Sequence, residues 1–293
     1  MAELTLTPQE KQTLLAYQRD ELTEHHIYTW LARTVREPEN RAVLERIAAD
    51  ELRHSRLWAR FTGQEVRPDW LKIRFYTWVG RILGITFAVK LMERGEEGAQ
   101  DNYSRMEGVV PDVGAIAQEE KAHEEALLVM LDEERLRYTG SIVLGLNDAL
   151  VELTGALAGL TFALQNTQLV AMTGAITGIA AALSMGASEY LSTKAEGDGR
   201  DPLRASLYTG VAYIFTVLAL ILPYLLLENP YLCLAATLTV AVLIIAFFTY
   251  YISVARDLPF RRRFLEMAGL SLAVAAVSFG IGILMRRVFG IEV

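Results

Sequence analysis

Two short stretches of the chain place a carboxylate and an imidazole one helical turn apart. DELRH contains Glu51-x-x-His54, and EEKAH contains Glu120-x-x-His123. A spacing of three residues puts both side chains on one face of a helix. A single pair is weak evidence, because Glu and His are common on solvated helices. Two pairs in a chain with only 4 histidines predict a shared metal site, since carboxylates and neutral imidazoles bind divalent metals.

A site for two metal ions also needs carboxylates from other helices, and the chain offers them. Glu21 and Glu96 are each followed seven residues later by a tyrosine. This repeated order of a Glu-x6-Tyr segment and then a Glu-x-x-His segment suggests an internal duplication of a helix pair. Glu93 and Glu97 lie beside Glu96, and the choice among these three stays open. Several carboxylates would bridge two hard cations and neutralise their charge.

A second group of polar side chains lies inside a long apolar run. The stretch GLNDALVELTGALAGLTFAL carries Asn147, Asp148 and Glu152. A carboxylate at the centre of a membrane costs about 2.5–3.5 kcal/mol even on lenient insertion scales. Asp148 and Glu152 are four residues apart, so they share one helix face.

Met185 and Glu189 repeat this spacing in the next apolar run. One interpretation is that the acids lie near the membrane surface or pair with arginines. We favour a polar path for a cation, because carboxylate and amide oxygens bind hard divalent ions and a thioether adds a softer ligand. Carboxylates also carry protons, so exchange of metal ions for H⁺ is expected.

The elements that must position these residues differ between the two halves of the chain. Residues 1–138 contain 19 Lys and Arg and 25 Asp and Glu, whereas residues 139–293 contain 9 and 10. The second half has room for five membrane-spanning helices of about 20 apolar residues each. We expect these spans at 141–164, 169–191, 205–227, 231–254 and 264–285.

Loop charges predict how the spans are oriented. Lys and Arg gather in segments that are cytoplasmic if the N-terminus is inside, and the loops at 165–168 and 228–230 carry none. The positive-inside rule therefore predicts a cytoplasmic N-terminal half and an external C-terminus. Arg286 and Arg287 are the exceptions. Small residues four apart in the first two spans indicate close packing of helices.

The N-terminal half is predicted to be a helical domain, so that the whole chain is all-α. Amphipathic periodicity indicates helices at about 8–35, 40–62, 86–107 and 112–137, which suits a four-helix bundle. Segment 70–92 is unusually apolar; we favour core packing over a position on the membrane surface. The polar N-terminus shows no secretory signal, so we expect this half in the cytoplasm. The acidic net charge of −7 argues against nucleic-acid binding.

The stretch GLNDALVELTGALAGLTFAL, followed by AALSMGASEYLSTK, resembles the vacuolar iron transporter family over about 139–293. The resemblance implies five spans, a homodimer and export of ferrous iron from the cytosol in exchange for H⁺. It implies that Asp148 and Glu152 line the path and that Met185 and Glu189 face them. The loop between the second and third spans is short, so a long metal-binding insert there has no counterpart.

Residues 8–137 resemble the ferritin-like superfamily, nearest its rubrerythrin or erythrin branch. The resemblance implies a four-helix bundle with a di-iron centre. Its implied ligands are Glu21, Glu51, His54, Glu96, Glu120 and His123, with Glu93 as an added carboxylate of the rubrerythrin type. The single cysteine, Cys233, cannot form the cysteine-held electron-transfer iron site of rubrerythrins, which argues against a self-sufficient peroxidase.

The order of the halves resembles the erythrin–vacuolar iron transporter fusions of bacteria, also called membrane-bound ferritins. We therefore expect a ferritin-like domain at 1–138 that binds iron and delivers or senses it, and a transporter at 139–293. The expected function is export of Fe²⁺ across the bacterial cytoplasmic membrane. Export of Mn²⁺ is an open variant, as is ferroxidase activity in the bundle. The main alternative is a di-iron oxidase or peroxidase that uses the spans as an anchor.

Overall fold

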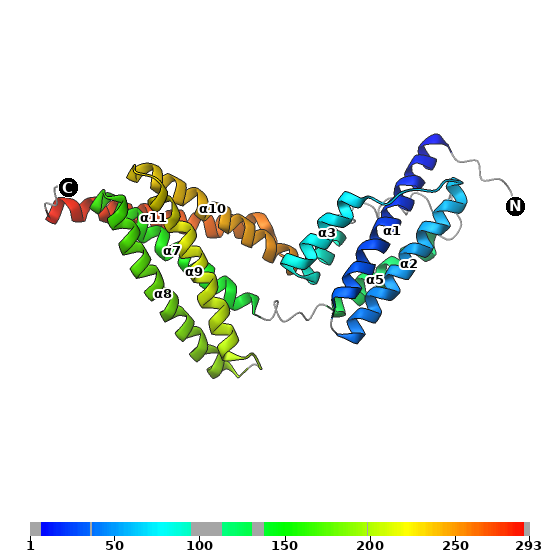
Figure 1. Cartoon of the computed structure of the whole chain (residues 1–293), viewed down its shortest axis with the longest axis horizontal. Coiled ribbons are helices and arrows are strands. Elements are labelled where there is room, and N and C mark those ends of the chain that lie inside the picture. The colour runs from blue at the N-terminus through cyan, green and yellow to red at the C-terminus, as the bar shows by residue number, and fades with distance from the viewer. Residues whose placement is uncertain (1–6, 36, 95–112, 131–137, 198, 290–293) are drawn as a thin grey trace. The chain divides into compact units, whose positions relative to one another are not determined.

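The chain forms helices throughout the described residues, as the sequence predicts. The computed structural model describes residues 7–35, 37–94, 113–130, 138–197 and 199–289 (Figure 1). The chain divides into two compact units, Met1–Glu133 and Glu134–Val293. Each unit is described by itself below.

The N-terminal unit contains α1 (Pro8–Thr34), α2 (Pro38–Thr62), α3 (Trp70–Leu83) and α5 (Val113–Met130). Residues 85–94 are also helical. The prediction of helices at 8–35 and 40–62 is confirmed to within two residues. Most of the predicted helix at 86–107, and the end of the one at 112–137, lie outside the described residues. Helix α3 is additional to the four predicted helices.

Local sequence signals fix where these helices begin and end. Thr7 and Glu10 form a capping box at the start of α1, which satisfies free N–H groups of the first turn. Helix α2 ends at Gly63, whose φ of +64° favours glycine. Asp69 accepts hydrogen bonds from the first N–H groups of α3. Gly84, with a φ of +100°, separates α3 from the helical residues 85–94.

Two apolar clusters form the core of the N-terminal unit. One contains Leu14 of α1, Trp58 of α2 and Ile116 of α5. The other cluster is formed by different turns of the same helices and contains Ile27 and Leu31 of α1, Leu44 and Ile47 of α2, and Leu127 of α5. Each of the three helices thus crosses from one apolar cluster to the other. The stretch of helix between the clusters is where the predicted Glu and His ligands lie.

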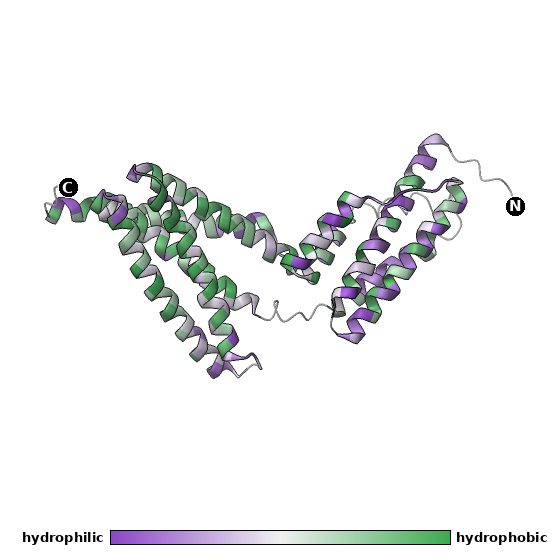
Figure 2. Cartoon of the chain, viewed as in Figure 1, coloured by the Kyte–Doolittle hydropathy of each residue, from purple (hydrophilic) through white to green (hydrophobic). Residues whose placement is uncertain are grey.

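The second unit consists of five long helices. They are α7 (Thr139–Leu164), α8 (Thr167–Glu196), α9 (Pro202–Leu226), α10 (Pro230–Ala255) and α11 (Phe260–Phe289). All five are long and apolar enough to cross a membrane, and Figure 2 shows hydrophobic residues along each of them. The prediction of five spans is confirmed, and the chain is a multi-pass membrane protein with five candidate spans. The loop between α8 and α9 is shorter than predicted, because α8 continues to Glu196.

Small residues let these membrane helices pack closely. A Cβ atom on Gly145 of α7 would lie 2.6 Å from the carbonyl oxygen of Thr209 in α9, far inside van der Waals contact. A Cβ on Gly178 of α8 would lie 2.7 Å from a methyl carbon of Val217. The prediction that small residues four apart serve helix packing is therefore confirmed at Gly178, and Gly145 adds a close contact that was not predicted.

Candidate functional site

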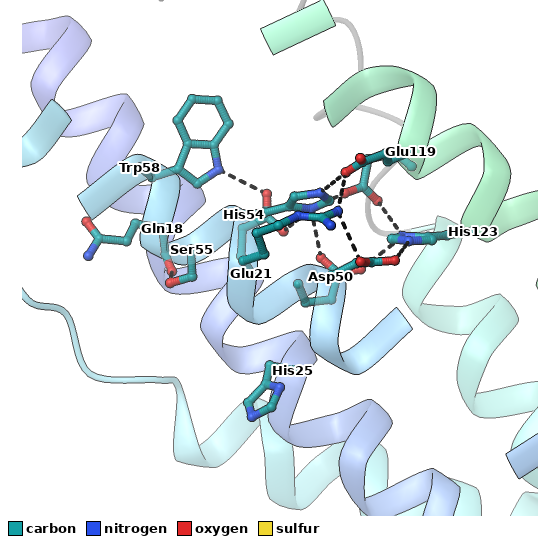
Figure 3. A network of polar contacts seen from close by, with 12 residues as sticks. Gln18, Glu21, His25, Asp50, His54, Ser55, Trp58, Glu119 and His123 are labelled. Carbon is teal, nitrogen blue, oxygen red and sulfur yellow. Dashed lines mark hydrogen bonds and ion pairs between the residues drawn. The ribbon is translucent and has the colours of Figure 1, made fainter. Parts of the chain in front are cut away.

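Four of the predicted ligands come together in the N-terminal unit. Glu21 of α1, Glu51 and His54 of α2, and Glu120 of α5 each offer a ligand atom within 4.8 Å of the others. Figure 3 shows this part of the unit, with Glu21 and His54 labelled. Glu21, Glu51 and His54 are buried, and Glu120 is half-buried. Three helices thus supply side chains to one internal space, between the two apolar clusters.

His123, the partner of Glu120 in the second Glu-x-x-His pair, lies beside this group. Its Nδ1 atom is 3.3 Å from Glu51 Oε1 and 3.7 Å from Glu120 Oε2. Its ring stacks against that of His54 at a centroid distance of 6.0 Å. The two pairs therefore meet across α2 and α5, and Glu51 and Glu120 lie between the two imidazoles.

Several polar atoms that face this space have no hydrogen bond. Within the part of the chain that the structure describes, Glu51 Oε2, His54 Nδ1, Glu120 Oε1 and His123 Nδ1 are buried and make no hydrogen bond, although His54 Nδ1 lies 3.1 Å from Glu120 Oε1 as an ion pair. A buried polar atom without a partner costs about 1–3 kcal/mol. Carboxylate oxygens and imidazole nitrogens that converge in this way fit a metal ion, which would coordinate them.

The pKa values of the cluster indicate that a bound metal ion would replace protons. Burial lowers the pKa of His123, but the adjacent carboxylates of Glu120 and Glu51 outweigh this effect and raise it to about 10. The carboxylates around His54 likewise outweigh its burial and raise its pKa. Burial raises the pKa of Glu21 well above its usual range. Protons therefore neutralise the metal-free cluster, and a bound cation would displace them.

A second layer of carboxylates holds the two histidines in place. The distance from His54 Nε2 to Glu119 Oε2 is 2.6 Å, and that from His123 Nε2 to Asp50 Oδ2 is 3.1 Å. Each histidine is thus held by an acid from the opposite helix. The Arg53 guanidinium joins the two acids, at 2.6 Å from Glu119 and 3.0 Å from Asp50.

These supporting residues were not predicted from the sequence. Asp50 and Glu119 each directly precede the glutamate of a Glu-x-x-His pair, so a pattern of two acids before x-x-His was the available signal. Trp58 was missed as well; its Nε1–H donates a hydrogen bond of 3.1 Å to Glu21 Oε1. A carboxylate on the far ring nitrogen fixes the tautomer and orientation of a metal-binding histidine.

A pocket of about 410 Å³ lies between α2 and α5 next to this cluster. Its lining includes His54 and Glu119, together with Arg53, Arg56 and Arg60. The pocket therefore reaches the supporting layer of the cluster from outside.

The remaining predicted ligands are not in this group. Glu93 is half-buried at the end of the helical residues 85–94, and the group of mutually close ligand atoms does not include it. Glu96 and Glu97 lie outside the described residues, so the open choice among the three stays a prediction.

The polar residues of the membrane unit are spread over α7 and α8. Asn147 and Asp148 are half-buried, whereas Glu152 is exposed. Glu152 Oε2 accepts a hydrogen bond of 3.0 Å from the hydroxyl of Tyr213, a fully buried residue of α9. Among the described residues, Asp148 and Glu152 have no third Asp, Glu, His or Cys near enough to complete a metal site.

The two residues predicted to face them from α8 have other neighbours. Met185 is half-buried and packs against the apolar core of the membrane unit. Glu189 is buried, accepts a hydrogen bond from the Ser141 hydroxyl, and lies 3.8 Å from the Arg200 guanidinium. This contact agrees with the alternative interpretation, in which acids of the membrane unit pair with arginines.

Comparison with known proteins bears on the membrane unit. A search among curated proteins found no match. Residues 139–201 match the model of the VIT family, and this region contains α7, α8 and all five predicted path residues. The protein thus carries a VIT family region that begins with the first of its five candidate spans.

Proposed function

We propose that this protein exports divalent metal ions, primarily Fe²⁺, from the cytoplasm through its membrane unit. The VIT family region supports the proposal, because that family implies transport of metal ions such as iron or manganese. The observation that carries it is the pair Asp148 and Glu152 within this region, on a helix that is otherwise uncharged. An anchor would have no use for two carboxylates that are costly to insert.

The exposure of Glu152 supports a path between two copies of the chain. A carboxylate on a lipid-facing surface is expensive, and such groups normally face a protein interior or a water-filled cavity. A second copy placed against α7 would cover Glu152 and bring a second Asp148–Glu152 pair to the same space. We therefore propose a homodimer in which carboxylates and the amide of Asn147 bind the passing ion and exchange it for H⁺. Met185 and Glu189 would act on the cytoplasmic side of this path.

The Glu and His cluster of the N-terminal unit supplies the capture step in this proposal. It would hold iron through Glu21, Glu51, His54, Glu120 and His123, with help from Glu93, Glu96 or Glu97. The convergence of buried carboxylate oxygens and imidazole nitrogens that make no hydrogen bond supports metal binding. The unit would then deliver iron to the path or sense its concentration. It lies in the cytoplasm of a bacterium in this proposal, and the C-terminus lies outside.

A second candidate function is a membrane-anchored di-iron oxidase or peroxidase. The observation that favours it is the support of both histidines by carboxylates, because such support also tunes metal centres for redox chemistry. The two candidates differ in what they require of Asp148. An anchor should tolerate its replacement, whereas a transporter should not.

The proposal is tested by transport into liposomes that contain the purified full-length protein. We expect Fe²⁺ uptake, accompanied by counter-movement of H⁺, to be lost in Asp148→Asn and in Glu152→Gln, because each variant keeps the volume and removes the charge. Glu228→Gln, on the exposed loop between α9 and α10, is the control and should transport normally. Normal transport by Asp148→Asn and Glu152→Gln would reject the path.

A further inference from the structure

Helix α3 presents an apolar face that the described residues of the N-terminal unit do not cover. Trp70, Leu71, Phe75, Trp78 and Ile82 are between 49% and 80% exposed. At 100° per residue these five positions fall within about 140° of the helix circumference. The opposite side of α3 is buried. The exposed residues therefore form a continuous stripe, hereafter the α3 stripe.

The buried side of α3 fixes the stripe to the rest of the unit. Ile73 belongs to the apolar cluster that contains Ile27 and Leu31 of α1. A Cβ on Gly80 would lie 3.0 Å from Leu31, so the two helices are closely packed. Because α1 also carries Glu21, the stripe and the metal cluster belong to one packed unit.

The charges of α3 differ from those of the unit around it. Residues 70–83 contain Lys72, Arg74 and Arg81 and no acid, although acids outnumber bases in the N-terminal half. Lys72 is engaged inside the unit, at 3.3 Å from Asp20. Arg74 and Arg81 are exposed, although the Arg81 guanidinium also lies 5.6 Å from the centre of the Trp30 ring. By helical geometry both arginines lie between Trp70 and Trp78 around the axis. The stripe is thus apolar and aromatic, with two cations within it near the Trp70 edge.

We propose that the α3 stripe binds the surface of a lipid bilayer that carries anionic headgroups. Aromatic and aliphatic residues on one face, with Arg beside them, are typical of helices that lie in the membrane interface. Trp is favoured at that depth because its ring is apolar and its N–H can reach water or headgroups. Arg74 and Arg81 would pair with lipid phosphates.

A bilayer fits the stripe better than a second copy of the chain does. The five candidate spans begin at Thr139, only a few residues after this unit ends at Glu133, so a bilayer is always within reach. A second copy docked through the same stripe about a two-fold axis would bring the arginines of the two copies toward each other. Like charges across an interface oppose association, whereas anionic lipid favours it.

Bilayer binding would hold the metal cluster at the membrane surface. The inference does not depend on what the cluster binds or on whether the membrane unit transports metal. It requires only that the protein is a membrane protein and that the described residues of the unit leave the stripe exposed.

Tryptophan fluorescence tests the inference directly, because all four tryptophans of the chain, at positions 30, 58, 70 and 78, lie in the N-terminal unit. The full-length protein is reconstituted in vesicles of phosphatidylcholine and phosphatidylglycerol. The phosphatidylcholine carries bromine near the headgroup end of its acyl chains, and unbrominated vesicles are the reference. We expect quenching in the wild type and loss of most of it in Trp70→Phe with Trp78→Phe. The control variant Trp30→Phe, at a half-buried position of α1, should keep the quenching.

A charge variant separates lipid binding from a folding defect. Arg74→Glu with Arg81→Glu keeps every tryptophan and should lose quenching, whereas Arg46→Glu with Arg56→Glu, exposed on α2, should not. High salt should weaken the wild-type signal. Absence of quenching in the wild type would overturn the inference. It would also be overturned if Leu71→Cys, with Cys233→Ser, cross-linked two copies through this position.

Discussion

At the scale of single residues, the metal cluster depends on a layer of carboxylates around its histidines. Asp50 holds His123 and Glu119 holds His54, at 3.1 and 2.6 Å. Supporting groups of this kind typically change metal affinity about 10–100-fold when they are removed. We therefore expect Asp50→Ala and Glu119→Ala each to weaken Fe²⁺ binding by about this factor, measured by anaerobic titration of the full-length protein.

The control for this prediction is Glu124→Ala. Glu124 is exposed on α5, so its removal changes net charge as much as Glu119→Ala does but leaves both histidines supported. Equal affinity in Glu119→Ala and Glu124→Ala would show that general charge, and not support of the imidazole, determines binding.

A single hydroxyl orients the exposed carboxylate of α7. Tyr213 is fully buried and donates to Glu152 at 3.0 Å. Tyr213→Phe should leave the fold intact and lower the transport rate, because Glu152 then loses the donor that fixes its position. The measurement is initial Fe²⁺ uptake into liposomes.

Tyr224→Phe is the matched control for Tyr213→Phe. Tyr224 is also a buried tyrosine of α9, and its hydroxyl bonds to Thr161, not to a carboxylate. Its loss should reduce stability somewhat but not the specific rate. A similar loss of transport in both variants would assign the effect to packing of α9.

At the scale of elements, the membrane unit depends on glycine at one crossing of α7 and α9. Because a Cβ on Gly145 would lie 2.6 Å from the Thr209 carbonyl oxygen, Gly145→Ala must push the two helices apart. Overpacking of this kind typically costs about 1–3 kcal/mol. We expect a lower unfolding temperature for Gly145→Ala in detergent. Gly280→Ala, on α11 with nothing within 4 Å of its Cβ, should unfold like the wild type, and equal losses would contradict the close crossing.

At the scale of the whole molecule, the proposed capture step predicts how transport depends on iron concentration. A site that collects Fe²⁺ near the path helps when free iron is scarce and adds little once iron saturates the path. Glu51→Ala with His54→Ala should therefore lower transport at low Fe²⁺ and leave the maximal rate nearly unchanged. The two single variants should not have additive effects, because both ligands belong to one cluster.

The same transport curves distinguish capture from the other roles of the N-terminal unit. If the unit gates the path, the double variant should change the maximal rate. If it is an oxidase, oxygen consumption with Fe²⁺ should vanish while transport stays the same at every concentration. An unchanged curve, with or without oxygen, would reject both capture and gating.

The sequence by itself determined the features that depend on local spacing. The number of spans followed from the length of the apolar runs, because a helix must cross about 30 Å of hydrocarbon. Glu51 and His54 were placed on one helix face by the helical repeat, as were Glu120 and His123. Glu21 was identified only through its repeated spacing to a tyrosine, and the structure brings it to the same cluster.

Tertiary structure alone decided which faces meet. The acids that hold each histidine come from the opposite helix, and the ion pair of Glu189 with Arg200 joins a helix to the following loop. The break at Gly84 was not predicted. For segment 70–92 we favoured core packing over a position on the membrane surface, whereas one face of α3 is exposed, because apolar residues that face outward have the same periodicity as those that face a core. Helical periodicity fixes the side of a helix on which a residue lies. What lies opposite that side is set by the packing of several helices at once, and no local pattern encodes it.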